Sequence, residues 1–309
     1  MLQVGPTTLA FVAGDLDLRG VWVPLITPFA ADGSVDVAAI ERLCTDYLDA
    51  GVTGIVALGT TGEPTALDET ERHAVVDTCA RVCAARGAPL IIGTGTNCTS
   101  TTVAATQAIS GTPALVGALV VVPYYVRPSE AGIVEHFKVV AAASPVPIVI
   151  YNIPYRTGRG LGSASLLELA STDNIAGVKQ SVGAIDADTL AVLRSAPRGF
   201  HVLSGEDALL YPLVLMGACG GITASSHVCT ARFVEMVECA LAGKLDDGRA
   251  HAEALLPVVQ AGFVEPNPAV FKGVLHAQGR IASPALRLPM TAAAPASVDA
   301  CLAAITAAG

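Results

Sequence analysis

The sequence predicts an α/β fold, a (β/α)8 TIM barrel with a C-terminal helical appendage. Short apolar runs recur along the chain, and each is followed by a segment whose apolar residues have helical spacing. Successive runs begin roughly 30 residues apart, which is the length of one strand–helix unit. Because the runs are almost continuously apolar, each strand is expected to be buried on both faces, as in a parallel sheet covered by helices.

The apolar runs place eight expected strands. They begin near Val21, Ile55, Ile91, Leu119, Ile148, Ala176, His201 and Gly221. The segments 36–50 and 68–85 are typical of the helices between them, because their apolar residues recur at helical spacing with charges between. Asp36 and Asp68 stand where helix N-caps are expected.

The strand pattern ends near residue 232, and helical segments continue to the C-terminus. We therefore expect a lead-in over residues 1–19, a barrel over 20–232 and a C-terminal helical region over 233–309. A doubly wound open sheet is the alternative architecture. It is disfavoured because no GxGxxG follows the first strand, and GTGTNC at 93–98 lacks the third glycine.

The composition limits the classes of function. The chain has 309 residues, of which 52% are hydrophobic and 15% charged, and this suits a compact protein with a large core. Its net charge of −9 argues against a nucleic-acid partner. No apolar run approaches the ~20 residues that span a bilayer, and the first 20 residues lack the basic region of a signal peptide. We expect a cytoplasmic protein without a membrane partner.

The cysteines do not suggest a metal centre. There are eight, and none forms a CxxC pair. Cys79 and Cys83 share a helical face, but no second pair follows at zinc spacing. The sequence therefore predicts small buried thiols in a reducing compartment and no metal site.

Residues with chemical function follow the expected strands at their carboxyl ends, where barrel active sites lie. They are GTTGE at 59–63, PYY at 123–125, Tyr151 and Asn152 with Arg156 after them, Lys179, SGED at 204–207, and Thr223 with Ser225. Singly, each could be a turn, a core contact or a surface ion pair. Together they indicate one pocket at the mouth of the barrel.

Lys179 indicates Schiff-base chemistry. It ends an apolar strand, and burial beside Ile175 and Val178 would lower its pKa from the usual ~10.4, so that a neutral amine can attack a carbonyl. Tyr151, at the end of the adjacent strand, is the candidate general acid/base. The turn at 60–62 offers N–H and O–H donors for a keto-acid carboxylate without a metal.

Six motifs carry a resemblance to a known family. They are GTTGE, PYYxRP, YNIPxRTG, GVKQS, SGEDA and FVEPNP, in that order. In them the chain resembles the pyruvate-dependent class I aldolases grouped with N-acetylneuraminate lyase, and most closely their dihydrodipicolinate synthase branch. The resemblance runs from about Gly20 to RLPMT at 287–291. It implies a covalent imine with pyruvate, no bound cofactor, and a homo-oligomer that is usually a tetramer.

The resemblance also implies roles for single residues in the chemistry. Lys179 forms the imine with pyruvate, and Tyr151 is the acid/base. Thr60 links Tyr151 to Tyr125 in a proton relay, with Tyr125 reaching in from a neighbouring subunit.

Other residues are implied to bind the substrates. Thr61, with the backbone of the turn at Gly62, holds the pyruvate carboxylate. Arg156 meets the carboxylate of the second substrate. The backbones of Gly205 and Ile222 line the pocket.

The branch depends mainly on Arg156, because sialic-acid lyases usually have an aliphatic residue there. We therefore expect condensation of pyruvate with L-aspartate 4-semialdehyde, in lysine and diaminopimelate biosynthesis. The alternative is an aldolase for a 2-keto-3-deoxy sugar acid or N-acetylneuraminate, which the departures Pro64 and Val126 leave open. A non-catalytic keto-acid-binding regulator is disfavoured, because it would not need the whole catalytic set.

Many members of this branch bind L-lysine as an inhibitor in a cleft between subunits. The matching positions here are Pro64, Glu69 with Arg72, and Thr101, while Asn97 and Tyr124 remain. Pro64 offers neither a hydroxyl nor an N–H, Arg72 would face the ammonium of the effector, and Thr101 has no negative charge to balance it. The resemblance therefore predicts an enzyme that is insensitive to L-lysine.

Overall fold

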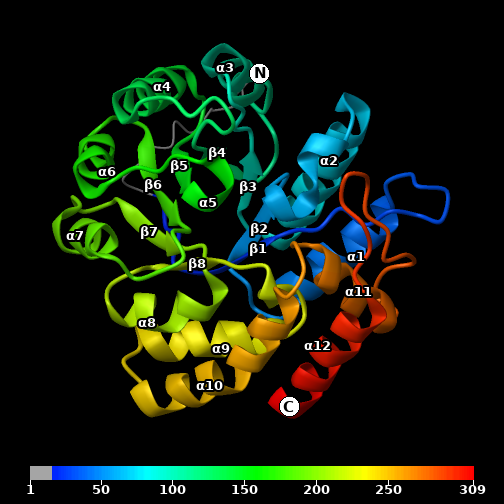
Figure 1. Cartoon of the computed structure of the whole chain (residues 1–309). Coiled ribbons are helices and arrows are strands. Elements are labelled where there is room, and N and C mark those ends of the chain that lie inside the picture. The colour runs from blue at the N-terminus through cyan, green and yellow to red at the C-terminus, as the bar shows by residue number, and fades with distance from the viewer. Residues whose placement is uncertain (1–15) are drawn as a thin grey trace, which may run out of the picture.

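The computed structural model describes residues 16–309, so the expected lead-in falls outside the described residues except for 16–19. Eight parallel strands close into a barrel in sequential order, β1-β2-β3-β4-β5-β6-β7-β8, with helices around it (Figure 1). This confirms the predicted fold class. The strands are β1 (Gly20–Pro24), β2 (Gly54–Ala57), β3 (Leu90–Gly93), β4 (Leu115–Val121), β5 (Ile148–Asn152), β6 (Ile175–Gln180), β7 (His201–Ser204) and β8 (Gly220–Ile222).

The start of β4 is the largest departure from the expected strand positions. It begins at Leu115, and not near Leu119, because Gly117 interrupts the apolar pattern that marked the strand. The first part of β4 is held by its neighbour, since Leu90 pairs with Leu115 and Ile91 with Gly117.

Helices follow the strands and form the outer layer. They are α1 (Val37–Asp49), α2 (Glu69–Arg86), α3 (Thr99–Ala108), α4 (Glu130–Ala143), α5 (Pro154–Thr157), α6 (Ser163–Ala170), α7 (Ala187–Ser195), α8 (Leu210–Leu215) and α9 (Thr230–Leu241). Both expected caps are confirmed. The Asp36 carboxylate accepts a hydrogen bond from Ala39 N, and Asp68 forms a capping box with Glu71.

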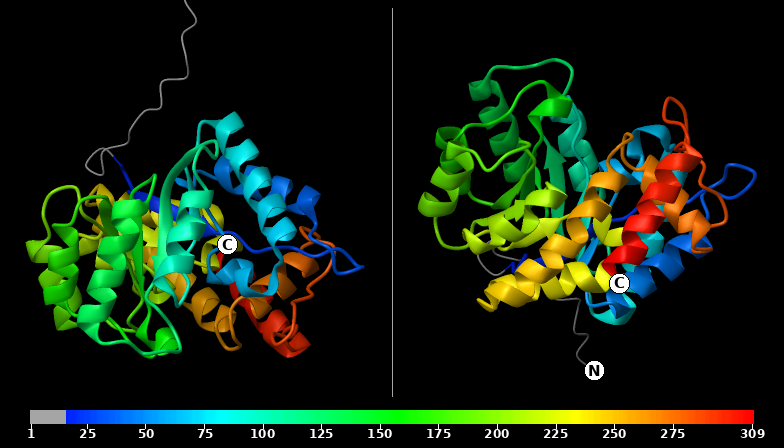
Figure 2. Two further views of the ribbon diagram at one scale, coloured as in Figure 1. Left: turned by 90° about the horizontal axis from the view of Figure 1, so that it is seen from above. Right: turned by 60° about the horizontal axis from the view of Figure 1, so that its bottom comes forward.

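Three further helices complete the C-terminal part: α10 (Leu245–Gly262), α11 (Ala269–Ala277) and α12 (Pro295–Ala308). They lie on one side of the barrel, where α10 packs on α9, α12 on α10 and α11 on α12 (Figures 1 and 2). The boundary expected at residue 232 lies inside α9, the helix that follows β8 and packs against β1. No helix within residues 16–309 is both long and apolar enough to cross a membrane.

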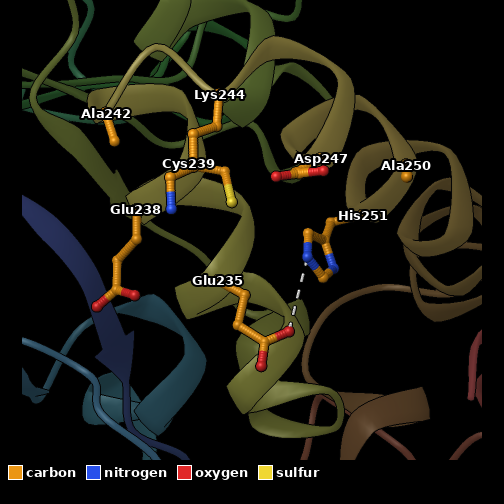
Figure 3. A pocket seen from close by; sticks show the side chains of 8 residues that line it. All are labelled: Glu235, Glu238, Cys239, Ala242, Lys244, Asp247, Ala250 and His251. Carbon is orange, nitrogen blue, oxygen red and sulfur yellow. Dashed lines mark ion pairs between the residues drawn. The ribbon is translucent and has the colours of Figure 1, made fainter.

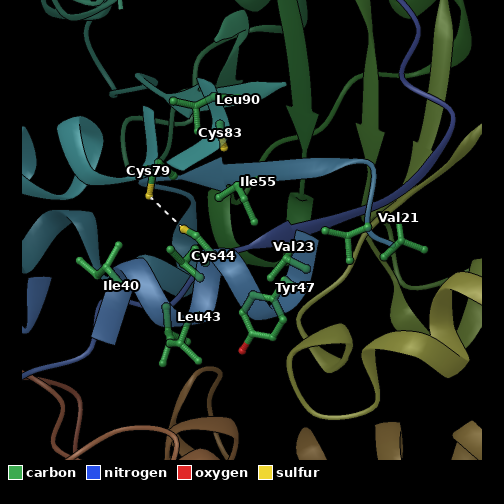
Figure 4. Close-up of a cluster of buried hydrophobic side chains, with 14 of the residues drawn as sticks. Val21, Val23, Ile40, Leu43, Cys44, Tyr47, Ile55, Cys79, Cys83 and Leu90 are labelled. Atoms are coloured by element: carbon green, nitrogen blue, oxygen red, sulfur yellow. Dashed lines mark hydrogen bonds between the residues drawn. The ribbon is translucent and has the colours of Figure 1, made fainter. Parts of the chain in front are cut away.

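Two apolar layers hold the barrel together. Its interior is filled by buried side chains from successive strands, among them Trp22, Val56, Val149 and Leu203. Leu16 and Leu18 join this interior cluster, and Leu18 O accepts a hydrogen bond from Trp22 Nε1 at 3.1 Å. A second layer lies between the strands and α1 and α2 (Figure 4).

Three cysteines belong to that second layer. Cys44, Cys79 and Cys83 are buried there, and 3.8 Å separates the sulfurs of Cys44 and Cys79. The prediction of buried thiols is wrong for Cys98, which is exposed because it precedes the first residue of α3 at the surface. The hydrogen bond to the Ser100 hydroxyl and those to the backbone lower the pKa of Cys98 to about 7.

Candidate active site

The centre of the site is a lysine and a tyrosine on adjacent strands. Lys179 in β6 is directly opposite Tyr151 in β5 in the register of the sheet, and each side chain is only 6% exposed. Lys179 Nζ lies 4.2 Å from the centre of the Tyr151 ring. The parallel register therefore places both groups at the same carboxyl end of the barrel.

The surroundings of Lys179 favour a neutral amine. Burial lowers its pKa to about 8. The negative charges of Asp207 and Glu206 act to raise this pKa, and the positive charge of Arg156 acts to lower it. Within residues 16–309 no hydrogen bond contributes to its titration. At pH 7 roughly a tenth of such an amine is unprotonated, against less than a thousandth for an ordinary lysine.

Tyr151 is the opposite case, a group kept protonated. Burial raises its pKa to about 12, while Arg156 and the hydroxyls of Thr60 and Ser181 act in the other direction. At neutral pH the phenol therefore holds its proton and lies close to two further hydroxyl groups. This is the arrangement that proton transfer to and from a carbonyl oxygen needs.

The turn after β2 brings Thr60 to Tyr151 and buries Thr61. Residues Thr60–Gly62 form a short 3-10 helix, and its backbone is flanked by positive φ angles at Leu58 (56°) and Glu63 (53°). Such angles are uncommon outside glycine and are held only by strong surroundings. One contact that holds this turn is a 2.7 Å hydrogen bond from the Thr27 hydroxyl to Gly62 O.

The C-terminal region supports the same turn. Lys272, which is fully buried in α11, forms a 2.7 Å salt bridge with Glu63 and donates to Ala285 O at 2.8 Å. Asn267 Nδ2 donates to Thr61 Oγ1 at 2.9 Å. Neither Lys272 nor Asn267 was predicted from the sequence to have a role, although Asn267 lies within the FVEPNP motif.

Arg156 lies on α5, directly after β5, and is exposed at the mouth. Its guanidinium carbon is 5.6 Å from the centre of the Tyr155 ring. Its charge contributes to the pKa values of both Tyr151 and Lys179, so it is electrostatically coupled to the two central groups.

Gly205 gives space to the centre of the site. A Cβ at this position would lie 1.8 Å from Ser181 Oγ and 2.9 Å from Lys179 Cε, so no larger residue fits. Ser181 itself is fully buried, and its hydroxyl has no hydrogen-bond partner of good geometry among the described residues. Sequence reasoning missed Ser181, although it is part of the GVKQS motif.

Ile222, at the end of β8, is 1% exposed and packs in the same interior cluster as Tyr151.

Asp207 is a buried carboxyl group near the lysine. Burial raises its pKa to about 6, and hydrogen bonds from Ser225 and the Lys179 charge act against this. Ser225 N donates to its carboxylate at 2.6 Å. Asp207 and Glu206 thus supply the negative potential that faces Lys179.

Tyr125 is not brought to these residues within the chain. It follows β4 with a φ of 70° and is 87% exposed. Arg127, two residues later, also has a positive φ (47°), and its Nε donates to Gly158 O at 3.2 Å. The loop thus presents the Tyr125 side chain to solvent.

A separate cavity of about 410 Å³ lies between α9 and α10 (Figure 3). It is lined by Glu235, Glu238, Cys239, Ala242, Lys244, Asp247, Ala250 and His251. None of the predicted site residues is among them. No cluster of three or more His, Cys, Asp or Glu side chains suited to a metal ion is found in residues 16–309.

Comparisons with known proteins agree with the geometry. The model of the dihydrodipicolinate synthetase family matches residues 17–308. The 4-hydroxy-tetrahydrodipicolinate synthase of Salinibacter ruber is 40% identical over 283 residues, which cover 91% of this chain and 92% of that protein.

Two solved structures are also similar. The chloride-inhibited dihydrodipicolinate synthase of Acinetobacter baumannii, complexed with pyruvate, has a TM-score of 0.90 and 31% identity over 94% of this chain and 99% of that one. The enzyme of Cyanidioschyzon merolae with lysine bound has a TM-score of 0.89 and 30% identity, covering 94% and 98% of the two chains.

Proposed function

The chain belongs to the dihydrodipicolinate synthetase family, and on that premise we propose that it condenses pyruvate with L-aspartate 4-semialdehyde through an imine on Lys179. The product is 4-hydroxy-tetrahydrodipicolinate, a precursor of diaminopimelate and lysine. One observation supports the assignment of Lys179 above the others: it is a buried lysine with a pKa lowered to about 8 and no hydrogen-bonding partner among the described residues.

The first half-reaction makes a nucleophile from pyruvate. The neutral Lys179 amine attacks the keto carbon, and the carbonyl oxygen leaves as water after it has received protons. Tyr151, whose pKa is raised to about 12, supplies and recovers these protons together with Thr60. Loss of a proton from the methyl group of the imine then gives an enamine.

The second half-reaction uses the enamine. Its carbon attacks the aldehyde of the second substrate, and the aldehyde oxygen takes a proton from Tyr151. The amino group of the bound product then attacks the imine carbon and releases Lys179. The sum is pyruvate plus aspartate semialdehyde giving product and one water. Arg156, exposed at the mouth, binds the carboxylate of the semialdehyde as a bidentate donor.

Borohydride trapping tests this proposal. Pyruvate and borohydride should leave a reduced adduct on Lys179, located by peptide mass spectrometry. Adding aspartate semialdehyde in place of borohydride should then give the cyclic product. Turnover only of a 2-keto-3-deoxy sugar acid or N-acetylneuraminate would identify the alternative aldolase, and no adduct at all would indicate a non-catalytic protein.

The functional unit is proposed to be a homo-oligomer, a tetramer, in the cytoplasm. Its support is Tyr125, which is 87% exposed, beside Val126 at 57%. In an oligomer Tyr125 would complete the relay in the site of a neighbour. Mixing the inactive variants Tyr125→Phe and Lys179→Ala should restore activity in hybrid oligomers, since some sites then hold both intact groups. No recovery on mixing would contradict the shared site.

Insensitivity to L-lysine is a further part of the proposal. It is supported by Arg72, whose Nε donates to Pro64 O at 3.2 Å and so puts a cation beside the turn, which would disfavour an effector ammonium there. Turnover should be unchanged in millimolar L-lysine, and saturable inhibition would refute this part alone.

A further inference from the structure

Two contacts join the turn after β2 to the C-terminal region, more than 200 residues later in the sequence. Asn267 Nδ2 donates to Thr61 Oγ1 at 2.9 Å. Lys272 Nζ binds Oε1 of Glu63, the residue two positions after Thr61 in the turn, at 2.7 Å. Glu63 Oε2 also accepts a 3.0 Å hydrogen bond from Arg287 N. The position of Thr61 relative to Asn267 is therefore fixed from both sides.

The direction of the hydrogen bond at Thr61 matters for its chemistry. An amide nitrogen can only donate, so the Thr61 oxygen accepts and its own hydrogen remains available. Within residues 16–309, the Thr61 hydroxyl donates to no protein acceptor, although the residue is only 4% exposed.

The opposite orientation of the amide is less favourable. Asn267 Oδ1 is buried without a hydrogen-bond partner among the described residues. Rotating the amide by 180° would exchange this single unpaired oxygen for a nitrogen with two unpaired N–H donors. When a keto-acid carboxylate accepts the Thr61 hydrogen, the orientation with nitrogen on Thr61 leaves one polar hydrogen unpaired, on the second N–H of Asn267, whereas the rotated amide leaves both N–H groups unpaired.

We propose that Asn267 is a positioning residue that directs the Thr61 hydroxyl hydrogen toward the carboxylate of the bound keto acid. The inference rests on the proposed function, in which Thr61 holds that carboxylate. A threonine hydroxyl without this contact rotates and can direct its hydrogen to other acceptors. A hydroxyl that already accepts from Asn267 presents its hydrogen to the pocket. The resulting bond to a carboxylate is charge-assisted, and such bonds contribute more than neutral ones.

The expected effect is on binding of pyruvate more than on chemistry. The carboxylate is present in the substrate, the imine and the enamine alike, so its bond stabilises all of them. Asn267→Leu, which keeps the branched shape of the side chain but removes the donor, should raise KM for pyruvate about tenfold and change kcat little. KM for aspartate semialdehyde should stay within about twofold.

A double-mutant cycle separates positioning from a general structural role. Thr61→Val removes the hydroxyl, and it should raise KM for pyruvate at least as much as Asn267→Leu. In the Thr61→Val background Asn267→Leu should add nothing, because its only effect passes through the missing hydroxyl. Asn267→Asp offers an acceptor in place of the donor, draws the Thr61 hydrogen away from the pocket, and should raise KM more than Asn267→Leu does.

The outcomes are distinguishable. Effects of Asn267→Leu that add to those of Thr61→Val, or that fall on kcat and both KM values alike, would overturn the positioning role. So would a wild-type KM for pyruvate in soluble, folded Asn267→Asp. Failure of the wild-type protein to form an adduct with pyruvate and borohydride would instead refute the proposed function, and with it this inference.

Discussion

Lys179 and Lys272 are both buried lysines whose pKa values are lowered to about 8 by burial, yet their surroundings differ. The Lys272 ammonium is paired with Glu63 at 2.7 Å, donates to Ala285 O and lies 4.1 Å from the centre of the Phe29 ring. Lys179 also lies beside a ring, 4.2 Å from the centre of Tyr151, but among the described residues it has neither an ion pair nor a hydrogen bond, and it borders Ser181 and the space kept by Gly205. A lowered pKa therefore does not mark a nucleophile by itself; a lowered pKa without satisfied hydrogen bonds is the stronger indication.

The largest test of this comparison is Lys179→Ala. Turnover should fall by several powers of ten, because the covalent nucleophile is lost. Lys272 should not replace it, since its ammonium is occupied by Glu63 and sealed from substrate. Peptide mapping after incubation with pyruvate and borohydride measures this directly. An adduct on Lys272 or another lysine would show that Lys179 is not the required nucleophile.

The next prediction concerns Tyr151 and Thr60, the proton-transfer groups that lie beside Lys179 and not beside Lys272. Tyr151→Phe and Thr60→Val should each lower kcat by ~10²–10⁴-fold. The concentration of pyruvate that half-saturates trapping should change much less, because both groups act on protons and not on the carboxylate. An unchanged kcat in either variant would contradict the relay.

Lys272→Met tests the other lysine through stability. It leaves Glu63 buried without its cation, which typically costs ~3–5 kcal/mol. The matched control is the double variant Lys272→Met with Glu63→Gln, which removes the charge but keeps an acceptor for Arg287 N. Urea unfolding should show a lower midpoint for the single variant and a partial recovery for the double one. Equal midpoints for wild type and Lys272→Met would show that the ion pair does not stabilise the fold.

Arg156→Ala tests whether the cation at the mouth of the site binds the second substrate. Losing a bidentate carboxylate contact should raise KM for aspartate semialdehyde by roughly 10–100-fold and KM for pyruvate by less. Arg156→Lys is the control, because it keeps the charge but not the paired geometry. Equal changes for both substrates would make Arg156 a residue of the scaffold.

The smallest effect is a change with pH. Imine formation needs the neutral amine, so its rate should rise as pH increases and level off above the Lys179 pKa of about 8. Below this value the rate should fall about tenfold per pH unit. Because Arg156 contributes to the lowered pKa of Lys179, the midpoint in Arg156→Ala should move upward. Stopped-flow measurement of pyruvate binding gives the profile, and a flat profile between pH 6 and about 9 would contradict the assignment.

Much of the barrel could be predicted from the sequence because each strand–helix unit carries its own local pattern. Burial on both faces makes the strands apolar, and the residue after the apolar run then marks the active end. The pairing of Lys179 with Tyr151 followed from adjacent parallel strands, and the structure places them opposite each other. The start of β4 was missed because Gly117 weakens the pattern, and pairing with β3 compensates for it.

The supporting residues could not be predicted in the same way. Asn267 and Lys272 contact the turn at 61–63 from more than 200 residues away, and no local pattern records which side chains meet over that distance. Lys272 also lies in a helix whose apolar surroundings give no sign of its partner. Ser181 was missed for a different reason: its importance depends on the space left by Gly205, which is a property of two strand ends together.

The packed interior of the barrel has a consequence for the traffic of molecules. Trp22, Val149 and Leu203 fill the middle of the sheet, and Leu16 and Leu18 join them from before β1. These side chains thus close the barrel from its amino end, and substrates reach Lys179 from the carboxyl end, where Arg156 is exposed. Both substrates therefore approach the lysine from the same end of the barrel.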